Sequence, residues 1–329
     1  MKDFLSKYNT VIFDMDGVIT SEEKYWDAAA LTVWEYLRFC RNESISAPQC
    51  MANVKEIRKT VFCDDLLIKT LKDKGVNSNW DLGYVTVLIA WILKTENFQE
   101  VLEYARALPE NIIDCYDKLA EECARVSGYD FEWLRRNGVM WQTMHGLFQE
   151  WYLGEEVWGK PAKNTGKKGL MFFEEPIVNK DKLKELLCKL SKTHRLCTGT
   201  GRPFDEMMTP LKEWGVVEFF DKKGLANYNM VEEAERRFER TLTKPHPYIF
   251  LKALYGIDCD DKKIVDGEFD KDEITKALVI GDAGADVLAA QAMGADFCAV
   301  LTGVAGKNAK GYFEKMNAQY ILDSVLDLI

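Results

Sequence analysis

The sequence predicts an α/β protein with a doubly wound, Rossmann-like parallel sheet that is interrupted after its first strand by a large helical insertion. Near the start of the chain, the apolar run at 10–14 (TVIFD) ends at an aspartate, and the same design returns at 277–282 (ALVIGD). Between them, residues 22–170 lack the alternation that is typical of strands. Short β-like runs that alternate with helices favour βαβ units and a parallel sheet.

The segments beyond the insertion alternate between helices and strands, as such a sheet requires. A stripe of leucines predicts a helix at 181–190, and another helix is expected from 285 to 293, ending at Gly294. The other expected elements are a strand and turn at 194–201, a helix at 203–214, a strand at 216–220, a helix that begins at Pro245–Pro247 and a strand at 297–303. Residues 1–21 and 171–329 are therefore assigned to one α/β domain.

The insertion, assigned to residues 22–170, is expected to be all-helical. It is rich in helix formers and holds eight of the nine tryptophans. Helices are predicted at about 22–41, 50–74, 80–94, 97–107, 110–126 and 130–153. The greasy stretch at 84–93 is far shorter than the roughly 20 residues that span a bilayer, so it predicts a buried helix. A glycine- and lysine-rich linker at 159–169, which includes Lys160-Pro161, leads back to the α/β part.

The overall charge and the cysteines narrow the class of protein. The formal net charge of −10 would repel nucleic acid and anionic membranes, so neither is expected as a general partner, while a divalent cation is compatible with it. The nine cysteines include no CxxC pair, which is typical of reduced thiols in the cytosol. The first residues lack the apolar segment of a secretory signal. A cytoplasmic protein is expected, and its oligomeric state stays open.

Two aspartates follow the first predicted strand. Asp14 ends the strand, and Asp16 stands two positions on, across a turn that Gly17 permits. The carboxyl edge of a parallel sheet is where α/β proteins place ligands. Paired carboxylates there can divide the work on a phosphate ester: one attacks phosphorus, and the other protonates the leaving oxygen and later activates water.

Three later segments add groups that suit the same chemistry. Thr200 and Gly201, after a strand and before a helix, offer a hydroxyl and an N–H to a phosphate oxygen. Lys244 precedes a proline-started helix, where a fixed ammonium would offset phosphoryl charge. Asp282 and Asp286 place two more carboxylates at the sheet edge, with small residues between them, and would complete an oxygen-rich magnesium site.

These segments, in this order, resemble the haloacid dehalogenase superfamily of hydrolases, in the branch that includes phosphoglycolate phosphatase and β-phosphoglucomutase. The matching motifs are DMDGVIT at 14–20, TGRP at 200–203, KPHP at 244–247 and GDAGAD at 281–286. Similar sequence covers 8–21 and roughly 175–305, about half of the chain. An insertion between the first and second motifs corresponds in that family to a helical cap, which closes over the site and selects substrates.

The resemblance implies a role for each matching residue. Asp14 would be the nucleophile that forms an aspartyl-phosphate, and Asp16 the general acid/base, which argues against a dehalogenase or a phosphonatase. Lys244 would hold the phosphate and steady Asp14. The phosphate-binding groups would also include Gly17, Thr20, Thr200 and Gly201. The magnesium site would be formed by Asp14, the backbone carbonyl of Asp16, Asp282 and, directly or through water, Asp286.

The predicted function is a Mg²⁺-dependent phosphate monoester hydrolase, phosphoglycolate phosphatase-like, that acts on a small phosphorylated metabolite. A phosphomutase shares every motif and is one alternative. A regulatory or scaffolding protein on a vestigial core is another, and the intact set of acids and lysine argues against it. A receiver-like phosphosignalling domain lacks both the cap and the DxDG motif.

Some positions leave the resemblance incomplete or open to other interpretations. Thr198 is an alternative to Thr200, although the glycine that follows Thr200 favours the latter. The insertion is about twice the length usual for the branch, so its substrate-contacting loop cannot be aligned. The acidic run at 258–273 is expected to be a solvated loop rather than a calcium site, because it lacks the required glycine. His246 is expected to cap the start of a helix.

Overall fold

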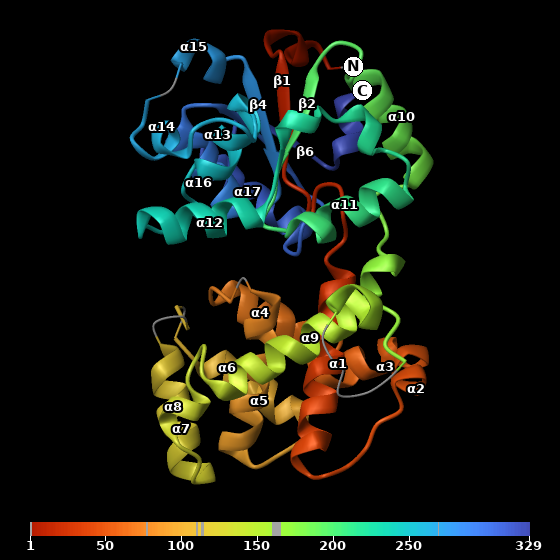
Figure 1. Ribbon diagram of the computed structural model, residues 1–329, viewed down its shortest axis with the longest axis vertical. Helices are drawn as coiled ribbons and strands as arrows, with labels where there is room; N and C mark the ends of the chain where they lie inside the picture. The colour runs from red at the N-terminus through yellow and green to blue at the C-terminus, as the bar shows by residue number, and fades with distance from the viewer. Residues whose placement is uncertain (1, 77, 110, 113–114, 160–165, 269) are drawn as a thin grey trace. The chain divides into compact units, whose positions relative to one another are not determined.

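The computed structural model describes residues 2–76, 78–109, 111–112, 115–159, 166–268 and 270–329. It divides the chain into two compact units: residues 1–22 with 174–329, and residues 23–173 (Figure 1). The first is an α/β unit and the second is helical. Residues 160–165 of the predicted linker, Lys160-Pro161 included, lie outside the described residues.

The α/β unit is built on a six-stranded sheet in which every neighbouring pair is parallel (Figure 1). The strand order is β3–β2–β1–β4–β5–β6, with β1 (Thr10–Phe13), β2 (Arg195–Gly199), β3 (Leu225–Ala226), β4 (Ala277–Gly281), β5 (Asp296–Val300) and β6 (Tyr320–Leu322). The chain therefore winds outward in both directions from β1, as predicted. In doubly wound sheets the point of reversal is where ligands bind, at the carboxyl ends of the strands.

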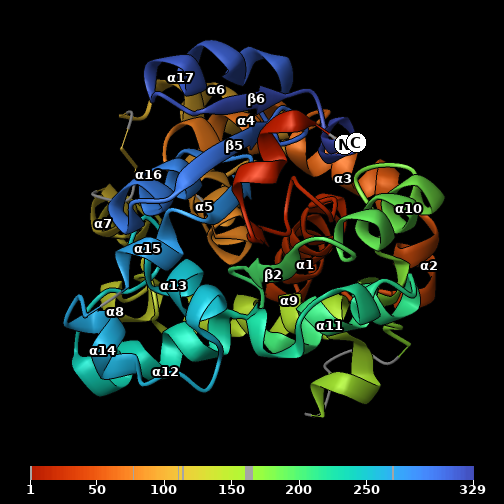
Figure 2. The same cartoon turned by 90° about the horizontal axis from the view of Figure 1, so that it is seen from above.

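Successive side chains of β1 point into two different cores, because strand side chains alternate between the faces of a sheet. Val11 and Phe13 belong to one cluster and Ile12 to the other. Figure 2 shows α10 and α11 on one side of the sheet, and α13 and α16 on the other. The helices of this unit are α10 (Lys180–Leu190), α11 (Phe204–Glu213), α12 (Tyr228–Phe238), α13 (Tyr248–Tyr255), α14 (Asp261–Val265), α15 (Lys271–Ile274), α16 (Gly284–Met293) and α17 (Lys310–Lys315).

The strand predicted at 216–220 is wrong. This segment contains the 3-10 turn η4 (Val217–Phe219), and the edge strand at this point in the chain is β3, only two residues long. Val216 and Phe220 are the two buried side chains of the run. Their spacing of four residues suits a helical turn better than a strand, in which every second side chain would be buried. The final strand, β6, is absent from the sequence prediction.

The second unit contains only helices among its described residues, and their apolar faces form one continuous core. They are α1 (Glu23–Cys40), α2 (Ala47–Ala52), α3 (Val54–Phe62), α4 (Leu66–Asp73), α5 (Asn79–Leu93), α6 (Phe98–Ala107), α7 (Tyr116–Ser127), α8 (Phe131–Leu134), α9 (Val139–Trp158) and the 3-10 helix η3 (Leu170–Phe173). The greasy stretch at 84–93 lies in α5, most of which is buried, as expected. Within the described residues, no helix is long and apolar enough to cross a membrane.

Two of the predicted helices are broken. The segment 50–74 divides into α2, α3 and α4, and Cys63, Asp64 and Asp65 all adopt positive φ between α3 and α4. The segment 130–153 divides into α8 and α9, and Asn137 between them has a φ of +65°. A left-handed backbone ends a helix, and apolar periodicity alone does not reveal these residues.

Candidate active site

Three aspartates meet at the carboxyl edge of the sheet. Asp14 follows β1, Asp282 follows β4 and Asp286 lies in the first turn of α16. The backbone N–H of Asp14 donates to the carbonyl oxygen of Ile280 at 2.9 Å, which brings the ends of the two neighbouring strands together. One carboxylate oxygen from each of the three aspartates lies within 4.8 Å of the others. The sequence motifs at 14–20 and 281–286 therefore form a single cluster.

Lys244 joins this cluster from the segment that precedes α13. Its Nζ lies 2.9 Å from Oδ1 of Asp14 and 2.8 Å from Oδ1 of Asp286. Burial disfavours the ammonium, but the charges of the two aspartates outweigh it, so the pKa of Lys244 is raised above its usual value. The lysine is held as a cation beside Asp14.

The aspartates themselves are crowded with negative charge. Burial raises the pKa of Asp14 to about 7, with Lys244 opposing and the neighbouring aspartates adding to the increase. Burial, and then the charges of Asp286 and Asp14, raise the pKa of Asp282 well above its usual range. The three carboxylates and the one ammonium carry a net charge of −2 when all are ionised. A divalent cation that prefers oxygen, such as Mg²⁺, fits this donor set in both charge and chemistry.

The Asp282 carboxylate occupies space that is open only because two neighbouring residues are glycines. A Cβ on Gly17, which has a φ of +71°, or on Gly303 would overlap Oδ2 of Asp282. Gly17 lies in the loop after β1 and Gly303 in the loop after β5. The Thr302 hydroxyl also donates to the Gly17 carbonyl oxygen at 2.5 Å, which ties these two loops together. The loop at 302–303 thus shapes the acidic cluster although it belongs to none of the four motifs.

Gly303→Ala is expected to leave the protein folded but to raise the Mg²⁺ concentration needed for half-maximal binding by about tenfold, equivalent to roughly 1.4 kcal/mol. The added methyl group must displace the Asp282 carboxylate, whereas the backbone at Gly303 has no positive φ to oppose alanine. Gly311→Ala is the matched control, because a Cβ there meets nothing within 4 Å. An unchanged affinity for Mg²⁺ in Gly303→Ala would contradict this account of the site.

The hydrogen-bond partners of the Asp16 side chain differ from those of the three-aspartate cluster. Its Oδ1 accepts hydrogen bonds from Nε and Nη2 of Arg202 at 2.9 and 2.6 Å, and from the Thr20 hydroxyl at 3.0 Å. The buried Arg202 also lies 3.4 Å from Oε1 of Glu174. Thr20 is expected from the sequence among the phosphate-binding groups, but its hydroxyl donates to Asp16 and the residue is fully buried.

The two candidate threonines of the second motif differ in their partners. Thr198 lies within β2, and its hydroxyl donates to Sδ of Met207 at 3.3 Å, on the side of the sheet that α11 covers. Thr200 lies beyond the strand end, and its Oγ1 accepts the backbone N–H of Arg202 at 3.1 Å. Gly201 is exposed, and nothing lies within 4 Å of the position a Cβ would take. Of the two threonines, Thr200 is the one that lies beyond the carboxyl end of the strand.

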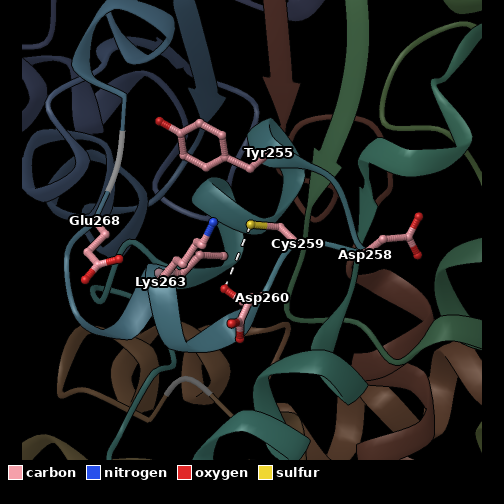
Figure 3. Close-up of a pocket in the computed structure, with 7 residues that line it drawn as sticks. Tyr255, Asp258, Cys259, Asp260, Lys263 and Glu268 are labelled. Atoms are coloured by element: carbon pink, nitrogen blue, oxygen red, sulfur yellow. Dashed lines mark hydrogen bonds between the residues drawn. The ribbon is translucent and has the colours of Figure 1, made fainter.

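Other polar features of the α/β unit lie outside this constellation. A hollow of about 470 Å³ lies around α14 (Figure 3) and is lined by Tyr255, Asp258, Cys259, Asp260, Lys263, Ile264 and Glu268. All of these residues except Tyr255 belong to the acidic run at 258–273, in which Asp260 and Asp270 cap the short helices α14 and α15. Nδ1 of His246 accepts the N–H of Tyr248 at 3.1 Å, so this histidine caps the start of α13, as expected.

A comparison with protein-family models finds a match for the part of the chain that supplies Lys244, Asp282 and Asp286. A family model described as HAD-hydrolase-like matches residues 241–328. This part of the chain is therefore similar to haloacid dehalogenase-like hydrolases. The α/β unit that contains it carries the expected doubly wound sheet and brings together the acids of the first and fourth motifs. A comparison with curated protein sequences gives no match.

Solved structures extend the similarity to the helical unit. A structural-genomics target known from an X-ray structure is 28% identical, with a TM-score of 0.83, and the match covers 97% of this chain and 97% of that one. Phosphatase Tt82 from Thermococcus thioreducens is 19% identical, with a TM-score of 0.50, over 95% of this chain and 91% of its own. The second similarity shows the fold alone. An α/β unit with a helical insertion is therefore an architecture that other proteins share.

Four residues of the site are not predicted from the sequence as functional. Arg202 is visible in the TGRP motif, but nothing in that motif indicates which acid it contacts. Thr302 and Gly303 directly follow an apolar strand, the same signal that points to Asp14 and Asp282. Glu174 follows the helical insertion and has no local pattern that distinguishes it.

Proposed function

We propose that this chain is a magnesium-dependent phosphate monoester hydrolase that acts through an aspartyl-phosphate on Asp14. The observation that carries the proposal is the separation of two kinds of carboxylate. Asp14, Asp282 and Asp286 share one cluster with Lys244, whereas Asp16 is held by Arg202. A nucleophile and a proton donor with different surroundings are what the two halves of this reaction require.

In the first step, a carboxylate oxygen of Asp14 attacks the phosphorus of the ester. The bond from phosphorus to the ester oxygen breaks, and Asp16, as the carboxylic acid, gives that oxygen its proton, so that an alcohol leaves. In the second step, water attacks the phosphorus of the aspartyl-phosphate and gives a proton to the Asp16 carboxylate, which releases inorganic phosphate and free Asp14. Lys244 offsets negative charge on the phosphoryl group in both steps.

Asp14, the Asp16 backbone carbonyl and Asp282 would hold Mg²⁺, and Asp286 would support it, directly or through water. When bound, the ion supplies electrostatic stabilisation of the transferred phosphoryl group. Both oxygens of Asp286 already have partners, since Oδ1 contacts Lys244 and Oδ2 accepts the Ala283 N–H at 3.2 Å. This pattern favours a supporting role for Asp286.

The helical unit would act as the cap that selects the substrate. It is inserted between Glu22 and Glu174, directly after the loop that carries Asp14 and Asp16. We propose a small phosphorylated metabolite as the substrate and the cytoplasm as the location. The acidic composition, with a net charge of −10, disfavours nucleic acid and anionic membranes as partners.

Release of inorganic phosphate from a panel of small phosphate monoesters tests the proposal. The assay compares protein in Mg²⁺ with protein in excess chelator. Release is expected with Mg²⁺ and should fall to background with the chelator, and the ranking of esters would describe the substrate pocket. A folded protein that binds Mg²⁺ but releases no phosphate from any ester would contradict the hydrolase assignment and favour a phosphomutase or a non-catalytic protein.

A further inference from the structure

The Asp16 carboxylate is held at one of its two oxygens. Oδ1 accepts three hydrogen bonds, two from the Arg202 guanidinium and one from the Thr20 hydroxyl. Within the described part of the chain, no hydrogen bond reaches Oδ2. The Asp16 side chain is 28% exposed, whereas that of Arg202 is 1% exposed. The carboxylate is therefore anchored through Oδ1 by a buried group, and Oδ2 remains available to a reactant.

Arg202 is itself fixed by partners other than Asp16. Nη1 and Nη2 each lie 3.4 Å from Oε1 of Glu174, and Nη1 donates to the Glu206 carbonyl oxygen at 3.3 Å. The Glu174 side chain is 1% exposed. During the reaction Asp16 alternates between carboxylate and carboxylic acid. Because Glu174 and the Glu206 carbonyl oxygen also contact Arg202, the guanidinium keeps partners that hold it in place when Asp16 is neutral.

We propose that Arg202 is a positioning residue, which together with Thr20 fixes Oδ1 of Asp16 so that Oδ2 carries the proton given to the leaving oxygen. The inference rests on the proposed function. Three donors already point at Oδ1, so a proton on that oxygen would face the guanidinium, and the neutral acid therefore carries its proton on Oδ2. As the ester bond breaks, this proton moves to the ester oxygen, and the electron pair of the O–H bond stays on Oδ2. Arg202 acts through Asp16 and contacts no reacting atom.

The dependence of the rate on the leaving group distinguishes this role from a structural one. A 4-nitrophenolate ion leaves without protonation, whereas an alkoxide needs the proton of Asp16. The experiment therefore measures kcat/KM for 4-nitrophenyl phosphate and for a primary alkyl phosphate. This constant reports the steps up to formation of the aspartyl-phosphate. The ratio of the two constants is independent of the fraction of protein that is active.

Arg202→Met is expected to raise the aryl-to-alkyl ratio by about tenfold to 10²-fold, since general acid catalysis contributes typically 10²–10⁴-fold. Arg202→Lys should restore part of the alkyl ester rate, because an ammonium can still donate to Oδ1. Thr20→Val removes the third donor and should shift the ratio in the same direction by a smaller factor. Thr20→Val and Arg202→Lys decide the question if Arg202→Met does not fold.

Arg195→Met is the matched control. Arg195 lies at the opposite end of β2 and pairs with Asp221, so its loss should leave the ratio unchanged. Equal losses for both esters in the Arg202 variants would overturn the inference, because a purely structural or phosphate-binding arginine slows both reactions alike. An inactive wild-type protein is a separate outcome: it would remove the proposed function, and the inference with it.

Discussion

Asp14→Asn is expected to reduce magnesium-dependent phosphate release by about 10⁴-fold or more, since loss of a covalent nucleophile removes the whole two-step route. An amide oxygen cannot form the aspartyl-phosphate. The reacting oxygen belongs to a residue that lies 2.9 Å from Lys244 and within the three-aspartate cluster, so the change affects the centre of the site. Phosphate release measured at saturating Mg²⁺ tests this expectation.

The same variant should not be less stable than the wild-type protein when Mg²⁺ is absent. The pKa of Asp14 is raised to about 7 in the folded protein, from about 3.8 in the unfolded chain, where the group is solvated. A carboxyl group whose pKa is higher in the folded protein than in the unfolded chain stabilises the fold at pH values below its pKa in the unfolded chain. This stabilisation is lost as the pH rises through the pKa of the folded protein. At pH 8 the ionised Asp14 therefore disfavours folding, and a neutral asparagine relieves the repulsion.

Asp261→Asn provides a control that is expected to lose stability and keep its activity. Oδ1 of Asp261 accepts from Nζ of the buried Lys252 at 2.6 Å, far along the chain from Asp14 and Asp16. Its loss should lower the melting temperature, followed by circular dichroism, and leave phosphate release unchanged. If Asp14→Asn instead unfolds the protein, Asp14 has a structural role and the nucleophile must be sought elsewhere.

The sequence predicts the α/β fold because each central strand is buried on both faces. Such strands have continuous apolar runs, as at 10–13 and 277–280, and each ends at a small or acidic residue. Edge strands lack this signature. β3 has two residues and β6 has three partly buried ones, so neither stands out from a loop. The apolar run at 216–220 reads as a strand because composition does not distinguish a buried turn from a short strand.

The four motifs predict which chemical groups form the site, but they do not predict all of the contacts between them. Asp14, Asp282 and Asp286 meet because the neighbouring strands β1 and β4 are parallel and end at the same edge of the sheet. The partner of Asp16 follows from no such rule. Arg202 is 186 positions away in sequence, and its side chain could equally have faced phosphate or solvent. The same holds for Thr20, because its rotamer, and hence its contact with Asp16, is set by packing.

Lys167→Met is expected to destabilise the helical unit by about 3–5 kcal/mol, the usual cost of removing one partner from a buried ion pair. Nζ of Lys167 lies 2.8 Å from Glu35 in α1 and 2.6 Å from Glu150 in α9, and its side chain has no exposed surface. Both glutamates are at most 5% exposed. Without the ammonium, two carboxylates remain close together away from water, where their repulsion is weakly screened.

Tryptophan fluorescence during urea unfolding measures this effect in the right unit, because eight of the nine tryptophans lie between Trp26 and Trp158. Lys59→Met is the control: Lys59 is 58% exposed and faces Asp64 at 3.9 Å, so the free energy of unfolding should change by less than about 0.5 kcal/mol. A similarly small change in Lys167→Met would show that the two glutamates do not depend on the lysine.

Glu35→Gln and Glu150→Gln, introduced together into Lys167→Met, should restore most of the lost stability. The three substitutions replace Lys167 and both glutamates by neutral side chains of similar volume, and a neutral, well-packed replacement of a buried ionic group is often as stable as the original. The triple variant therefore distinguishes two explanations for the loss of stability in Lys167→Met. Recovery would assign the loss to uncompensated charge, whereas a persistent loss would assign it to the packing of the lysine stem between α1 and α9.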